Sequence, residues 1–138
     1  MSAYFISTNL IKVKEAAKEL SELYGKTADI YNCGKINIAI SAAYKNGYIL
    51  HSFGENRIFI IGTIFNKDGF GQEIFTRFTC YEKFITELKN TEQKFFGHYV
   101  VICMDVENQS VEVIPDRMGL INTYYANGDK DDYYISND

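Results

Sequence analysis

A nearly continuous apolar run occupies the middle of the chain: Arg57-Ile58-Phe59-Ile60-Ile61-Gly62-Thr63-Ile64-Phe65. A strand with one face in water alternates apolar and polar residues, whereas a run of this kind is typical of a strand that is covered on both faces. A second long apolar run follows at 96–106. Together, the two runs predict the central strands of a sheet that is buried on both sides.

An amphipathic helix is predicted near the N-terminus, with Asn9 as a good N-cap and Gly25 as a natural stop. Between them, apolar residues recur at helical spacing: Leu10, Val13, Ala16, Ala17, Leu20, Leu23 and Tyr24. A second helix is predicted to begin near Thr79, because Thr79 and Glu82 have the spacing of a capping box. Each helix is expected to pack one face on a sheet.

Turn signals divide the rest of the chain into strands. Asn46-Gly47 predicts a two-residue hairpin between a strand at 36–44 and a strand at 48–53. Further turn signals stand at 54–56, 66–69, 107–110 and 127–129. The predicted strands are 3–7, 36–44, 48–53, 57–65, 96–106, 111–114, 120–126 and 132–136.

This order of elements favours two layers of sheet. Two helices cannot cover one large sheet on both faces and also bury continuous apolar strands, so two stacked sheets with helices outside are expected. No linker or repeat divides the chain. The expectation is therefore a single domain over residues 1–138 of the α+β class, built as a four-layer αββα sandwich of antiparallel sheets.

Composition excludes several classes of protein. The formal net charge is −4, and nucleic-acid binding depends on clustered Lys and Arg. The three cysteines are widely spaced and form no CxxC, the N-terminus has no secretory signal, and no apolar run is long enough to span a membrane. We therefore expect a cytoplasmic protein with reduced thiols that binds neither nucleic acid nor membranes.

Three segments carry a resemblance to a known family. Phe96-Gly97-His98-Tyr99-Val100-Val101-Ile102-Cys103-Met104-Asp105 and Pro115-Asp116-Arg117-Met118-Gly119-Leu120-Ile121-Asn122-Thr123-Tyr124-Tyr125 resemble, in order and spacing, the glutaminase-type N-terminal domain of asparagine synthetase-like proteins. Ile61-Gly62-Thr63-Ile64-Phe65-Asn66 is similar to that family's Asn-Gly-Glu-Ile-Tyr-Asn. The resemblance implies a class II glutamine amidotransferase domain with the fold of the N-terminal-nucleophile hydrolases, here degenerate and possibly truncated.

The resemblance also implies a site that has lost its chemistry. Ser2 stands at the position of the nucleophilic Cys, and its α-amine would act as base only after removal of Met1. Ile61 replaces the Asn that holds the oxyanion, and the loss of one such donor costs on the order of 100-fold to 1000-fold in rate. Gly62 is retained and Thr63 replaces a Glu, so these two residues mark a degenerate substrate pocket.

Other reactive residue types are interpreted as structural. Cys33-Gly34 is similar to the family's Cys-Gly start, but the segment from Cys33 to Gly62 is too short to contain the family's first helix. Cys80 has no catalytic partner nearby in sequence, and His51 and His98 lie in predicted strands with no ligands at metal spacing. Asp116 is expected to fix the turn before Gly119, which would supply a backbone conformation that other residues resist. Neither a metal nor a cofactor is expected.

Three functions remain open on this basis. The first is a non-catalytic glutamine amidotransferase-like domain that supports or regulates an ATP-dependent, asparagine synthetase-like enzyme forming amides or lactams, in cis or in trans. The second is a residual amidohydrolase that uses Ser2. The third is a protein-interaction module whose contact face holds four tyrosines, Tyr124, Tyr125, Tyr133 and Tyr134. A homo-oligomer is compatible with each of them.

Overall fold

The computed structural model describes residues 3–24, 27–41, 48–90, 92, 94–119, 121, 123–128 and 132–137. Its helical elements are α1 (Leu10–Tyr24), the 3-10 helix η1 (Gly71–Phe75) and α2 (Tyr81–Leu88). Its strands are β1 (Ala3–Ser7), β2 (Asp29–Cys33), β3 (Ile36–Ser41), β4 (Tyr48–Phe53), β5 (Asn56–Asn66), β6 (Gly69–Phe70), β7 (Phe96–Asp105), β8 (Ser110–Pro115), β9 (Tyr124–Asn127) and β10 (Tyr133–Ser136).

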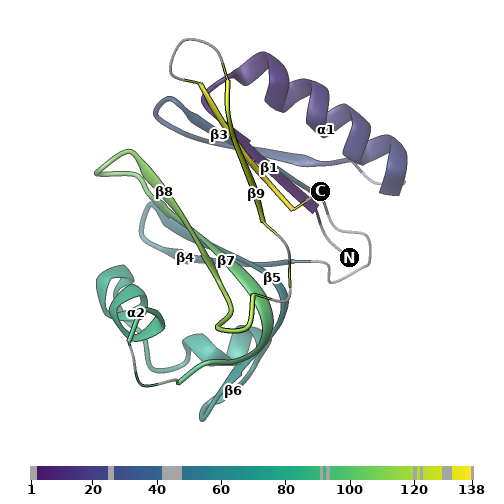
Figure 1. The fold of residues 1–138 in the computed structure, drawn as a ribbon. Coiled ribbons are helices and arrows are strands. Elements are labelled where there is room, and N and C mark those ends of the chain that lie inside the picture. Colours follow the sequence, from purple (N-terminus) through teal and green to yellow (C-terminus); the bar gives the residue numbers. More distant parts are fainter. Residues whose placement is uncertain are drawn as a thin grey trace.

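The strands form two antiparallel sheets (Figure 1). Sheet A has the order β2-β3-β1-β10-β9, so it combines strands from both ends of the chain. Sheet B has the order β4-β5-β7-β8, with β6 paired to β5, and comes from one continuous stretch. The register places Phe5 of β1 opposite both Ala39 of β3 and Ser136 of β10.

The main hydrophobic core lies between the two sheets. Tyr4 and Ile38 of sheet A pack in one cluster with Phe59, Val100 and Ile102 of sheet B. Each of these side chains is at most 1% exposed. The apolar runs of β5 and β7 therefore bury one face in this core, as the sequence predicts.

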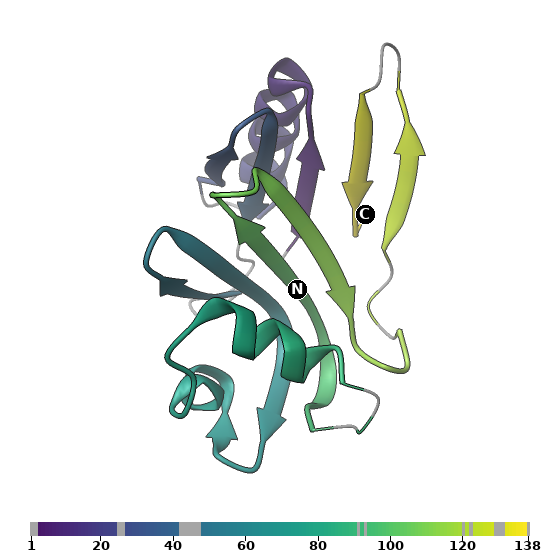
Figure 2. The same ribbon diagram turned by 90° about the vertical axis from the view of Figure 1, so that its left-hand side faces the viewer.

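Helix α1 covers the outer face of sheet A. It begins where the sequence predicts, because the side-chain Oδ1 of Asn9 accepts a hydrogen bond from the backbone N–H of Lys12 (3.1 Å). Its apolar stripe places Val13 and Ala17 against Ala3 and Ala39. Figure 2 shows that β9, at the edge of sheet A, lies beyond the part of the sheet that α1 covers.

A second core lies on the other face of sheet B. Phe84 of α2 and Phe75 of η1 pack there against Ile60 and Val101. Figure 1 shows β5 and β7 curving around α2 and η1. Gly62 and Gly97, both with positive φ (99° and 117°), lie where the two strands pass each other. Because of this curvature, sheet B wraps around the second core. This core lies on the face of sheet B opposite to the one that packs on sheet A.

The predicted four-layer αββα sandwich is wrong. Of the residues that the structure describes, 49% lie in strands and 23% in helices, and they form two antiparallel sheets with two α-helices. The physical reason is that, in the described part of the chain, each sheet is covered by one α-helix: α1 packs on β1, β2 and β3, while the eight-residue α2, with the short η1 beside it, packs on sheet B. One helix on each sheet does not make a helical layer, so the α+β class with an N-terminal-nucleophile architecture does not describe this chain.

The predicted hairpin at Asn46-Gly47 is also wrong, although these two residues themselves lie outside the described part. The strand before them, β3, pairs with β1 and β2, whereas the strand after them, β4, pairs with β5. The chain therefore crosses from one sheet to the other at this point. The hairpin that β3 does form is with the preceding strand, β2. Their connection passes through Gly34, whose φ of 61° suits a tight turn.

Helix α2 begins later than the capping-box spacing predicts. Its first residue is Tyr81 and its N-cap is Cys80, which makes no side-chain capping bond. The turns at 54–56 and 66–69 and the paired strands β9 and β10 agree with the sequence signals. Among the described residues, neither helix is long and apolar enough to cross a lipid bilayer.

Candidate functional site

The structure places Gly62 and Thr63, the residues of the expected substrate pocket, on β5. Ile61 is fully buried in the core between the sheets. Thr63 is exposed on β5, opposite His98 of β7. Neither Gly62 nor Thr63 lines any of the four main cavities found among the described residues. Ser2 lies outside the described residues.

Gly62 has a structural reason to be glycine. A Cβ added to it would overlap the carbonyl oxygen of His98 and would approach Ile121 Cδ1 to 2.8 Å. Its φ of 99° lies where side-chain-bearing residues are strained. The retained glycine therefore allows the close passage of β5 and β7.

Asp116 and Gly119 form the turn that the sequence predicts. The buried carboxylate of Asp116 accepts hydrogen bonds from the backbone N–H groups of Tyr99 (3.1 Å) and Met118 (2.9 Å). The N–H of Gly119 donates to the carbonyl of Asp116 (3.0 Å), and Gly119 has a φ of 61°. The motif segment thus fastens the end of β8 to β7.

The two histidines lie apart. His51 of β4 stacks on Phe75 (4.0 Å between ring centroids), and its Nδ1 bonds to the side chain of Gln72 (2.8 Å). Burial lowers the pKa of His51, which favours the neutral ring in this aromatic contact. His98 is exposed on β7. Within the described ranges, no three His, Cys, Asp or Glu side chains are grouped so that they could hold a metal ion.

The cysteines divide into two buried thiols and one accessible thiol. Cys33 and Cys103 are 2% and 1% exposed, and burial raises the pKa of both, helped by Asp105 for Cys33 and by Glu112 for Cys103. Cys80, at the start of α2, is partly exposed. A raised pKa leaves less of the nucleophilic thiolate at neutral pH.

We therefore expect iodoacetamide to alkylate Cys80 in the folded protein and to leave Cys33 and Cys103 unmodified. Denatured protein should take up label at all three positions, because both burial and the raised pKa are then lost. Mass spectrometry of tryptic peptides measures the label at each cysteine. Equal rates at Cys80 and Cys103 under native conditions would contradict the described packing.

The four tyrosines do not form one contact face. Tyr133 belongs to the side of sheet A that faces the main core, whereas Tyr134 packs on Phe5 (5.8 Å between centroids). Pairing of β9 with β10 puts Tyr125 opposite Ile135 and Tyr124 opposite Ser136, so one tyrosine of each strand lies on each face. The predicted face is wrong because adjacent strand residues point in opposite directions.

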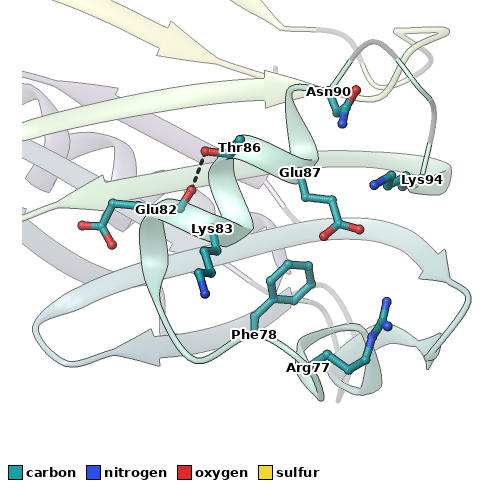
Figure 3. A pocket seen from close by; sticks show the side chains of 8 residues that line it. All are labelled: Arg77, Phe78, Glu82, Lys83, Thr86, Glu87, Asn90 and Lys94. Carbon is teal, nitrogen blue, oxygen red and sulfur yellow. Dashed lines mark hydrogen bonds between the residues drawn. The ribbon is translucent and has the colours of Figure 1, made fainter.

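The largest of the four cavities is an open groove of about 680 Å³ beside α2 (Figure 3). We call it the α2 groove. Its lining residues come from the polar side of α2 and from the segments before and after the helix: Arg77, Phe78, Glu82, Lys83, Thr86, Glu87, Asn90 and Lys94. The opposite side of α2 holds the buried Tyr81 and Phe84, so the packing of that apolar side turns the polar side to the groove.

The α2 groove has an apolar floor between charged walls. The ring of Phe78 packs on Phe84 (5.2 Å between centroids) and Phe95 (6.3 Å). Figure 3 shows this ring between the side chains of Lys83 and Glu87. The surface therefore offers one fixed aromatic contact surrounded by charges of both signs.

The charged lining residues differ in their partners. Arg77 Nε donates to Asp68 (2.9 Å), whereas neither Lys83 nor Lys94 makes an ion pair within the described residues. The only hydroxyl in the lining, that of Thr86, donates to the backbone carbonyl of Glu82 (2.8 Å). The lining holds no Cys or His. The groove thus has unpaired cations for recognition but no activated nucleophile.

A polar hollow of about 500 Å³ lies at one end of sheet A. Its polar side chains bond to one another, since Thr8 Oγ1 donates to Asp132 (3.0 Å) and Asn32 Nδ2 donates to Asn37 (2.8 Å). These mutual bonds leave the hollow fewer polar groups for a ligand than the α2 groove has.

Sequence reasoning missed the α2 groove. The polar residues of α2 are a visible signal, because they alternate with the apolar residues of an amphipathic helix. Asn90 and Lys94, however, carry no local signal, because only the fold brings their segment beside Phe78. Compared with protein-family models, with curated proteins and with solved structures, the chain matches none of them.

Proposed function

We propose that this chain is a non-catalytic binding module that holds a segment of a partner protein in the α2 groove. The observation that carries the proposal is the groove itself: an aromatic floor at Phe78 beside Lys83 and Lys94, which have no ion-pair partner within the described residues. Aromatic side chains are enriched where proteins bind one another, and Phe78 is partly exposed on the floor of the groove.

The form of the groove favours a polypeptide over a small metabolite. Small-molecule sites are mostly enclosed and apolar, whereas this groove is open and its walls are long charged side chains. A segment that lays an apolar side chain on Phe78 could present acidic groups to Lys83 and a basic group to Glu87. We therefore expect a partner segment with an apolar anchor flanked by charges of both signs.

The partner that the sequence resemblance implies is one candidate for this role. An asparagine synthetase-like, ATP-dependent enzyme, in the same polypeptide or a separate one, would receive support from a domain that binds without turning over glutamine. The corrected fold lends the resemblance no support, so the binding proposal depends on the groove alone.

A photocrosslinking amino acid in place of Thr86 tests the proposal. Thr86 is exposed in the groove, and Lys18, which is exposed on α1, gives a matched control position on the other helix. The expected result is a defined crosslinked partner from Thr86 and none of that partner from Lys18. The partner is then purified, and its affinity is measured by calorimetry.

Groove variants decide whether that binding is specific. Phe78→Ala and Lys83→Glu are each expected to weaken binding of the purified partner about tenfold or more, the usual scale for anchor residues. Leu23→Ala, which removes an exposed apolar side chain from α1, should leave the affinity unchanged. If the groove variants bind the partner as wild type does, the groove is not the site.

A further inference from the structure

Strand β4 lies at the edge of sheet B opposite to β8 (Figure 2), and no described strand pairs with its outer side. An edge strand presents a row of unpaired backbone N–H and C=O groups, and most proteins guard it with charged side chains, with proline or by keeping it very short. The six residues of β4 include neither a proline nor an Asp, Glu, Lys or Arg. This edge of sheet B is therefore unguarded.

The other edges that the structure describes are guarded in the usual ways. β8 carries Glu112 and ends at Pro115, and β2 begins at Asp29. β9 and β6 have only four and two residues. Among the described edge strands, β4 thus stands out as a long one without a charged side chain.

Every second residue of β4 directs its backbone groups away from the sheet. Phe53 pairs with Asn56 across the two-residue turn at 54–55, and the pair that flanks such a turn exchanges hydrogen bonds. Bonded and non-bonded pairs alternate along an antiparallel ladder, so only alternate residues of β4 bond to β5. The residues between them, whose N–H and C=O groups point outward, are Tyr48, Leu50 and Ser52.

A second bond in sheet B leads to the same assignment. The N–H of Asp116 donates to the carbonyl of Tyr99 (2.8 Å), and the alternation carried from this pair across β7 and β5 again leaves Leu50 and Ser52 pointing outward. Within the described residues, the outward backbone groups of Leu50 and Ser52 have no partner, and both side chains are exposed. Such a row of backbone groups is complemented by another extended polypeptide.

Antiparallel pairing with a second copy of β4 satisfies these outward groups. With a two-fold axis at Leu50, Leu50 faces Leu50 of the second copy and Tyr48 faces Ser52, and each of these pairs exchanges two hydrogen bonds. No like charges meet in this register. The corresponding pairing of β8 would place Glu112 opposite Glu112 of the second copy, which is destabilising. Of these two edges of sheet B, β4 is therefore the one suited to pair with itself.

Opposite charges complement each other across the same axis. Arg57 of β5 lies opposite Ser52, and its guanidinium lies over the ring of Tyr31 (5.5 Å to the centroid). Asp29 of β2 accepts a hydrogen bond from the hydroxyl of Tyr48 (2.5 Å). Neither Arg57 nor Asp29 makes an ion pair within the described residues. Because the axis places Ser52 beside Tyr48 of the second copy, Arg57 and the second copy's Asp29 lie at the two ends of one row of side chains. This arrangement occurs twice, which favours a second copy over an unrelated strand.

We propose that two copies of this chain associate through β4, in antiparallel register about a two-fold axis at Leu50, so that their B sheets form one continuous sheet. The proposal goes beyond the binding of a partner protein and does not depend on it, because no residue of β4 lines the α2 groove. Two six-residue strands make a small interface, so we expect a weak dimer whose population rises with protein concentration.

Sedimentation velocity over a range of protein concentrations tests the dimer, and charge substitutions at Leu50 test the axis. Leu50→Lys and Leu50→Glu each place like charges opposite each other and should raise the dissociation constant about tenfold or more. An equimolar mixture of the two variants should dimerise again, with a dissociation constant within about threefold of the wild-type value, because Lys then faces Glu. Circular dichroism of each variant verifies that it is folded.

Two further variants are matched controls. Ile30→Lys changes a residue of similar exposure on the edge strand β2 (42%, against 38% for Leu50) and should leave the dissociation constant unchanged. Phe78→Ala, which alters the α2 groove, should also leave the dimer unchanged and so separates this interface from the binding of a partner protein.

Several results would overturn the proposal. They are a wild-type chain that is monomeric at every concentration, a dimer that neither Leu50 variant weakens, equal weakening by Ile30→Lys, and a mixture of the Leu50 variants that associates no better than either variant alone. A monomeric chain that binds an extended peptide along β4 would assign this edge to a different polypeptide and would reject the second copy as its occupant.

Discussion

Gly62→Ala is expected to destabilise the protein by about 3 kcal/mol or more, because two costs add. Backbone strain at a φ of 99° costs on the order of 1–3 kcal/mol for a residue with a side chain. The new methyl group would also overlap the carbonyl oxygen of His98, which is backbone and cannot rotate away. Urea unfolding followed by circular dichroism measures the change, with the midpoint and the slope fitted separately.

Gly54→Ala provides the matched control for Gly62→Ala. Gly54 also has a positive φ, 62°, but no atom lies within 4 Å of a Cβ built there. Only the backbone cost of about 1–2 kcal/mol should then remain. Equal destabilisation by the two substitutions would contradict the close passage of β5 and β7, and an unaffected Gly62→Ala would reopen a role for Gly62 in a pocket.

Phe84→Ala is expected to cost about 3–5 kcal/mol, the usual range for removing a fully buried phenylalanine. The Phe84 ring is 0% exposed, and it contacts four other phenylalanine rings at centroid distances of 4.9–6.2 Å: Phe53, Phe75, Phe78 and Phe95. The cavity left behind would lie between α2 and sheet B. The free energy of unfolding is again measured in urea.

Phe70→Ala is the control for this substitution. Phe70 is 65% exposed and contacts Phe65 at 5.0 Å between centroids. Loss of one exposed ring contact should cost about 1 kcal/mol or less. If Phe84→Ala were as mild as Phe70→Ala, α2 would not be held to sheet B by this aromatic cluster, and the α2 groove would lose its fixed floor.

The sequence predicts local features of the fold well and non-local pairing poorly. Asn9 and the apolar residues after it place α1, because both signals act within a few residues. Asn46-Gly47 is an equally strong local signal, yet β3 and β4 belong to different sheets. Pairing of β3 with β1 gives Ile38 and Ile40 a place in the main core, and this long-range gain decides the partner.

The candidate site is less visible in the sequence than the fold. Gly62 and Asp116 stand out in the motif segments, but the structure explains both through backbone geometry and turn bonding. The α2 groove depends on Phe78 and Lys94 meeting across the fold. No local pattern in the sequence indicates this meeting, because the fold alone brings the segment of Lys94 beside Phe78.

The mixed origin of sheet A has a consequence for synthesis on the ribosome. The strands of sheet B emerge one after another and can pair as they leave the exit tunnel. Strand β1, in contrast, is the first described strand to be made but pairs with β10, which is the last. Until then, two of the five strands of sheet A, the sheet that covers Phe59 and Val100, are missing. The nascent chain is therefore exposed to aggregation until translation reaches β9 and β10, and chaperones would act on it in that interval.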